Sequence, residues 1–253
     1  MKKILFAILL VVVAFGVAPA QIAKPWKDWS KKDAEKILND SAWGRTQEDT
    51  DASQLMFSPT ANDTLTQSTK SRTDASGVAG GPNTDTGAKN QALSLKYRIR
   101  FFSAKPVRQA FARIIVLGQT DEQKGKQMAA KLQTAFVDLD YGDYIVVAVA
   151  PEGTDRRQIG PADQALRTAT VATLKNGCFL ERKDGKRMFL VEYQEPTPDQ
   201  TGAKFIFSRS EDGKPFITSE SDVVRFVAEI NDKMKLNMKF KVADMIYDGK
   251  LEY

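Results

Sequence analysis

The chain lacks histidine entirely and has a single cysteine among its 253 residues. Without histidine it cannot form a Ser-His-Asp or Cys-His catalytic centre, a histidine-anchored zinc site or an imidazole proton shuttle. With one cysteine it can form neither a Cys/His metal cluster nor an intrachain disulfide. We therefore expect no cofactor and no bound metal. Cys178 itself stands in an apolar stretch, which indicates a buried and unreactive thiol.

The chain also lacks a strong excess of charge of one sign. It has 37 basic and 32 acidic residues, mixed along its length, so it shows no basic stripe of the kind that binds nucleic acid. At 42% hydrophobic residues it can bury one substantial core, and its length suits one domain with appendages.

The first twenty residues form a pattern of their own. Two lysines follow Met1, an apolar run extends from Ile4 to Val13, and Ala18-Pro19-Ala20 precedes Gln21. This pattern predicts a secretory signal peptide over residues 1–20 and an exported protein, periplasmic or extracellular. The apolar run is short for a membrane span, so we expect no transmembrane span after cleavage.

Residues 21–45 predict a short helix rich in tryptophan. Ser30 and Asp33 have the spacing of a capping box, and the only tryptophans of the chain, Trp26, Trp29 and Trp43, fall in this segment. Two interpretations follow. The indole rings can grip a partner surface or a sugar ring, which makes these three the candidate binding residues. Alternatively, the helix docks onto its own body, because an isolated helix of this length is marginally stable.

Residues 46–92 differ in composition from the rest. Fourteen of these 47 residues are Ser or Thr, and large apolar residues are sparse apart from Leu55-Met56-Phe57. This composition predicts a disordered Ser/Thr-rich linker.

Residues 93–253 are expected to form one α+β body with a largely antiparallel sheet, Asp-Gly hairpins and packed helices. The expected elements are a strand from Leu93 to Phe101, a helix opened by Ser103 and Pro106, a second helix capped by Thr120, a central strand from Tyr144 to Ala150, a helix from Ala162 to Leu174, hairpin turns at Asp184-Gly185, Asp212-Gly213 and Asp248-Gly249, and a helix from Asp222 to Asn231.

Three stretches resemble a family of uncharacterised exported bacterial proteins. They are Lys24–Ser41 (KPWKDWSKKDAEKILNDS), Ser103–Ala110 (SAKPVRQA) and Asp244–Glu252 (DMIYDGKLE). The resemblance spans nearly the whole mature chain. It implies export and this order of segments, and it assigns no activity and no catalytic residue.

Two acidic groups are candidates for chemistry. Glu152 and Asp155 follow the most apolar strand, where they can divide the roles of general acid and base, although polar residues are also the default for a surface loop. Asp138, Asp140 and Asp143 match a calcium loop only in part, which favours a solvated turn.

A set of basic residues is a candidate contact surface. These residues can face an anionic surface or an acidic partner, or they can form a sheet face that is solvated or covered by a helix. They are Lys96, Arg98 and Arg100 on one strand face and Lys105, Arg108 and Arg113 close behind.

Together these observations favour a non-enzymatic binding or envelope-associated module that acts through protein surfaces. Its partner would be a protein or a component of the cell envelope, and not nucleic acid. The alternative is a histidine-free, carboxylate-dependent hydrolase with its site near Glu152 and Asp155.

The signal peptide generates the first testable prediction. N-terminal sequencing of the exported protein should read from Gln21, because the small residues Ala18 and Ala20 precede that bond. A protein that retains Met1 would contradict cleavage, and material that stays in the membrane after a carbonate wash would indicate an anchor.

Overall fold

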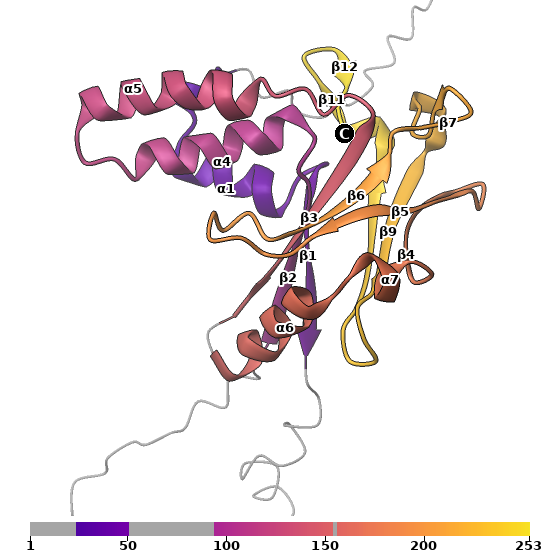
Figure 1. Ribbon diagram of the computed structural model, residues 1–253. Helices are drawn as coiled ribbons and strands as arrows, with labels where there is room; N and C mark the ends of the chain where they lie inside the picture. Colours follow the sequence, from indigo (N-terminus) through magenta and orange to yellow (C-terminus); the bar gives the residue numbers. More distant parts are fainter. Residues whose placement is uncertain (1–23, 51–93, 154–155) are drawn as a thin grey trace, which may run out of the picture.

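The computed structural model describes residues 24–50, 94–153 and 156–253. The signal peptide, most of the expected linker and Asp155 lie outside the described residues. Within them the chain is a mixture of helices and a large antiparallel sheet, so the α+β fold class is confirmed (Figure 1).

One eight-stranded sheet organises the structure, with every neighbouring pair antiparallel. Its spatial order is β1-β2-β3-β6-β5-β4-β9-β10. The strands are β1 (Gly44–Thr50), β2 (Ser94–Phe101), β3 (Tyr144–Glu152), β4 (Cys178–Arg182), β5 (Arg187–Gln194), β6 (Ala203–Ser208), β9 (Val223–Glu229) and β10 (Lys235–Lys241). Two small hairpins accompany it, β7 (Ser210–Glu211) with β8 (Lys214–Pro215) and β11 (Ile246–Tyr247) with β12 (Lys250–Leu251).

The sheet curls until its first and last strands meet. The side chain of Gln47 on β1 donates from Nε2 to the Lys235 carbonyl at 2.9 Å and accepts at Oε1 from the Asn237 amide at 2.8 Å, and both partners lie on β10. The rings of Phe101 on β2 and Phe240 on β10 are 4.8 Å apart between centroids. The apolar face of the sheet therefore encloses the main core.

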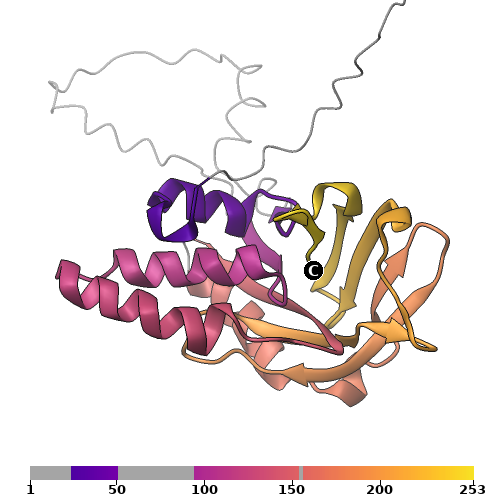
Figure 2. The ribbon, with the colours of Figure 1, turned by 90° about the horizontal axis from the view of Figure 1, so that it is seen from above.

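Helices cover the outside of one part of this sheet. The three longer helices near the N-terminal end lie side by side, with α4 between α1 and α5, as Figures 1 and 2 show. Beneath them Phe102, Val146 and Ile206 form a second apolar cluster on the outer face. The helical elements are η1 (Trp26–Asp28), α1 (Lys31–Asn39), α4 (Lys105–Leu117), α5 (Glu122–Leu132), the π-helix η3 (Gln133–Val137), α6 (Arg156–Thr168), α7 (Val171–Leu174), η4 (Ser219–Ser221) and η5 (Val242–Asp244).

Several local predictions are confirmed. The capping box is present at the start of α1, where the Ser30 amide donates to Asp33 Oδ2 at 2.9 Å and the Asp33 amide donates to Ser30 Oγ at 3.2 Å. The Asp-Gly turns at Asp184 and Asp248 connect β4 to β5 and β11 to β12. These features depend on neighbouring residues alone, so sequence patterns identify them.

Four predictions about individual elements are wrong in type, extent or capping residue. The expected linker begins too early, because Thr46–Thr50 belong to β1 and pair with β2. The segment predicted as a helix from Asp222 to Asn231 contains strand β9, in which burial alternates residue by residue. The helix after Thr120 is capped by Asp121. The helix predicted over residues 162–174 is divided into α6 and α7 by a second capping box at Thr170.

The physical reasons lie in tertiary pairing. In β1, Glu48 forms a salt bridge with Lys96 at 2.7 Å and Thr46 accepts from Arg98, so polar residues that suggest a linker are stabilised by the neighbouring strand. In β9 the apolar residues fit both periodicities, and the β-branched valines favour the strand.

Among the described helices, none combines the length and apolar character that crossing a membrane requires.

Gly44 generates a prediction, because a Cβ atom there would lie 2.4 Å from the Leu38 carbonyl oxygen of α1. We expect Gly44→Ala to lower the free energy of unfolding by about 1–3 kcal/mol in urea titrations, as overpacking does. The control is Gly160→Ala in α6, where a Cβ meets nothing within 4 Å. There alanine should be neutral or stabilising by up to about 1 kcal/mol. Equal effects of the two substitutions would contradict close packing of α1 on β1.

Candidate functional site

The three tryptophans proposed as binding residues lie in the core. Trp26, Trp29 and Trp43 are 5%, 0% and 6% exposed. Their indole N–H groups donate, each at 2.8 Å, to Gln133 Oε1, the Lys24 carbonyl and the Glu252 carbonyl, respectively. The N-terminal segment thus docks onto its own body, which is the second interpretation drawn from the sequence. The exposed indole faces that the first interpretation requires are not available at these positions.

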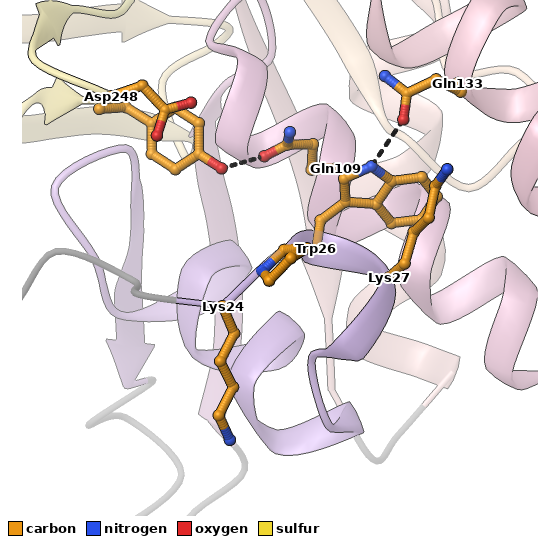
Figure 3. A pocket seen from close by; sticks show the side chains of 8 residues that line it. Lys24, Trp26, Lys27, Gln109, Gln133 and Asp248 are labelled. Carbon is orange, nitrogen blue, oxygen red and sulfur yellow. Dashed lines mark hydrogen bonds between the residues drawn. The ribbon is translucent and has the colours of Figure 1, made fainter.

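A surface pocket of about 480 Å³ lies beside Trp26 (Figure 3). It forms where four parts of the chain meet: the segment around η1, helix α4, the π-helix η3 and the β11–β12 hairpin. The lining residues are Lys24, Pro25, Trp26, Lys27, Gln109, Gln133, Tyr247 and Asp248.

Gln109 is the central polar group of this pocket. Its side chain is 6% exposed, and its Oε1 accepts a hydrogen bond from the Tyr247 hydroxyl at 2.6 Å. Its Nε2 has no hydrogen-bond partner among the described residues. The Nε2 group is therefore an unused donor that is open to solvent in the lining of the pocket, where a ligand can accept a hydrogen bond from it.

Tyr247 keeps its proton at neutral pH. Burial, followed by the nearby Asp248 carboxylate, raises the pKa of Tyr247 to about 12. Its O–H is committed to Gln109, so the lone pairs of the phenolic oxygen remain as acceptors.

Opposite charges flank the pocket. Lys27 Nζ lies 5.8 Å from the centroid of the Trp26 ring, near Gln133, while Asp248 lies beside Tyr247 on the other side (Figure 3). The Lys24 ammonium points away from Gln109 in the same view. Neither Lys27 nor Asp248 forms a salt bridge with another described residue.

Sequence reasoning identified Trp26 but missed Gln109, Gln133, Tyr247 and Asp248 as functional candidates. A signal was present, since the three stretches on which the resemblance rests supply every lining residue except Gln133.

The basic residues singled out in the sequence are all paired within the protein, and two of them, Arg100 and Arg108, are buried. Arg100 is buried and donates to the Leu38 carbonyl at 2.8 Å, and burial lowers the pKa of Arg100 to about 10. Arg108 and Arg113 likewise donate to backbone carbonyls, of Val137 and Trp29 among others. The remaining three pair with acids, Lys96 with Glu48, Arg98 with Glu152 and Lys105 with Asp138. These side chains fasten helices and strands together.

Glu152, the centre of the hydrolase hypothesis, is held by Arg98. The two guanidinium nitrogens of Arg98 donate to the carboxylate at 2.6 and 3.1 Å. These hydrogen bonds hold the pKa of Glu152 below its ordinary value, which opposes the protonated form that a general acid needs. Asp155, its suggested companion, lies outside the described residues.

The remaining candidates fit structural roles. Asp138 accepts from Gln133 Nε2 at 2.9 Å, and Asp140 accepts from the Gly142 amide at 2.8 Å, as in a solvated turn. No cluster of three potential metal ligands occurs within residues 24–50, 94–153 and 156–253. Cys178 is fully buried, and burial raises the pKa of its thiol, which favours the inert form.

Exposed apolar side chains offer a weaker candidate surface. Phe189 and Val191 on β5 are 46% and 53% exposed. Single exposed apolar residues are normal on soluble domains, and this pair brings no directional polar group with it. The pocket beside Trp26 is therefore the better-defined site.

Comparison with known proteins found no match: no family model, no curated protein and no solved structure is similar to this chain.

Docking of the N-terminal segment generates a stability prediction. Replacing the fully buried Trp29 by Ala should lower the free energy of unfolding by about 3–5 kcal/mol, because it removes a large core side chain. Tyr144→Ala, at a half-exposed aromatic, is the control and should change it by less than about 1 kcal/mol. Thermal melting followed by circular dichroism measures both. If Trp29→Ala left the melting temperature unchanged, the N-terminal segment would be undocked in solution.

Proposed function

We propose that this chain is an exported, non-enzymatic binding module that holds a ligand in the pocket beside Trp26. The observation that carries the proposal is the free Nε2 donor of Gln109 on a side chain that is otherwise buried. The burial of the rest of the side chain and the hydrogen bond to Tyr247 hold this donor in a fixed position, which favours a ligand that accepts from it.

The rigidity of the lining supports binding. Trp26 is fixed by its bond to Gln133, and Tyr247 is fixed by its bond to Gln109. Tyr247 also packs against Trp43 in a T-shaped pair with centroids 6.1 Å apart. A site whose side chains are already held in place loses little conformational entropy when a ligand enters.

The chemistry of the lining favours binding over catalysis. Tyr247, with its pKa raised to about 12, is a hydrogen-bonding group and a poor base at neutral pH. Gln109 can orient a ligand through its Nε2 donor without exchanging protons with it, while Gln133 and the Trp26 N–H are already paired within the protein. Glu152, on the alternative hydrolase hypothesis, is already paired with Arg98.

The proposed location rests on the sequence pattern of residues 1–20. A signal peptide over residues 1–20 would deliver the module to the periplasm or beyond the cell, where its partner is a component of the envelope or another exported protein. The pairing of its basic strand residues within the protein gives no support to nucleic-acid binding.

The test is co-sedimentation of the purified mature protein with cell envelopes of its native host. Wild-type protein should sediment with the envelopes, and Asp248→Asn should reduce the bound fraction severalfold, because it removes the carboxylate at the pocket edge. The matched control is Asp212→Asn. Both aspartates occupy Asp-Gly-Lys turns with positive φ, 48° at Asp248 and 50° at Asp212, a conformation that asparagine tolerates.

Equal sedimentation of the Asp248→Asn and Asp212→Asn variants would contradict the pocket as the binding site. A wild-type protein that stays in the supernatant would contradict an envelope partner.

A further inference from the structure

The hydrogen-bonding groups of the pocket are of two complementary kinds. Gln109 Nε2 has an unused donor, and the phenolic oxygen of Tyr247 has unused acceptor capacity. The Asp248 carboxylate only accepts hydrogen bonds, and the Lys27 ammonium only donates them. A ligand group that pairs with these donors and acceptors at the same time must itself both donate and accept hydrogen bonds. The hydroxyl group does this, and adjacent hydroxyls on a ring do it repeatedly.

The opposite charges flanking the pocket give an ionic ligand little net attraction. Lys27 and Asp248 lie on opposite sides of Gln109, and the ammonium of Lys24 points away from it (Figure 3). An anionic ligand attracted by the Lys27 ammonium would be repelled by the Asp248 carboxylate, and a cationic ligand attracted by Asp248 would be repelled by Lys27. A neutral ligand meets neither penalty and uses both groups as hydrogen-bonding partners.

The size and apolar edge of the pocket suit a sugar. A volume of about 480 Å³ falls within the usual range of small-molecule sites, roughly 300–1,000 Å³. Pro25 and the small part of Trp26 that remains exposed contribute apolar surface to the lining, which can contact the C–H groups of a pyranose ring at its edge.

From these observations we propose that the pocket binds a neutral, hydroxyl-rich saccharide unit of one or two rings, with Asp248 and Tyr247 as acceptors and Gln109 as donor. This inference rests on the proposed function and names the ligand class of the same site.

The experiment titrates the full mature protein with four disaccharides and follows binding by saturation-transfer NMR and tryptophan fluorescence. Cellobiose and chitobiose are neutral, deacetylated chitobiose is cationic, and digalacturonate is anionic. We expect saturable binding of at least one neutral disaccharide and weaker binding of both charged ones. Asp248→Asn should weaken that binding at least about tenfold, as expected for the loss of a charged hydrogen-bonding partner, and Asp212→Asn should leave it unchanged.

A second substitution tests the donor. Gln109→Glu keeps an acceptor for the Tyr247 hydroxyl and removes the Nε2 donor, so it should also weaken binding of the neutral disaccharide. Its melting curve reports whether the fold survives, and the exposed Asp248→Asn variant keeps the inference testable if it does not.

The outcomes separate the two proposals. Preference for digalacturonate or for deacetylated chitobiose would overturn the neutral class while leaving a binding pocket. No binding of any disaccharide, with envelope sedimentation still sensitive to Asp248→Asn, would overturn the saccharide class and leave the proposed function. Insensitivity of both assays to Asp248→Asn would overturn both.

Discussion

The docking of residues 24–50 onto the body is the constraint on which the rest of the structure depends. This segment supplies helix α1, which lies along α4, and strand β1, which completes the sheet beside β2. Gln47 then joins β1 to β10 and closes the curl of the sheet. The three tryptophans are anchors of this arrangement, since each buries a large apolar ring and satisfies its N–H on a different partner.

The same docking creates the candidate site. One wall of the pocket is the N-terminal segment itself, and the others are α4, η3 and the β11–β12 hairpin. The hydrogen bond between Tyr247 and Gln109 joins residues 138 positions apart in the chain. Stability and the proposed ligand recognition therefore use neighbouring surfaces of one segment. Trp26 illustrates this, because its N–H fastens the segment to Gln133 while its edge lines the pocket.

Local signals in the sequence were sufficient for some elements and not for others. The capping box at Ser30, the apolar strand β3 and the Asp-Gly turns depend on residues near one another in the chain. Strand β1 depends on salt bridges and hydrogen bonds to β2, and β9 depends on its position between β4 and β10, so propensity alone misassigned both. The pocket was missed for a related reason. Its polar residues are unremarkable separately, and only the fold brings Gln109, Tyr247 and Asp248 together.

The hydrogen bond from Trp43 to the Glu252 carbonyl has a consequence for the order of folding. It joins residues that are 209 positions apart in the chain. The Lys105 amide also donates to the Glu252 carboxylate, so the C-terminal residues hold both the N-terminal segment and the start of α4. During synthesis, Trp43 and Lys105 are made before Glu252 and cannot form these hydrogen bonds until Glu252 is available. Contacts of such sequence separation form slowly because the loop they close is long. The docking of Trp43 and the anchoring of the start of α4 therefore both depend on one distant residue, Glu252.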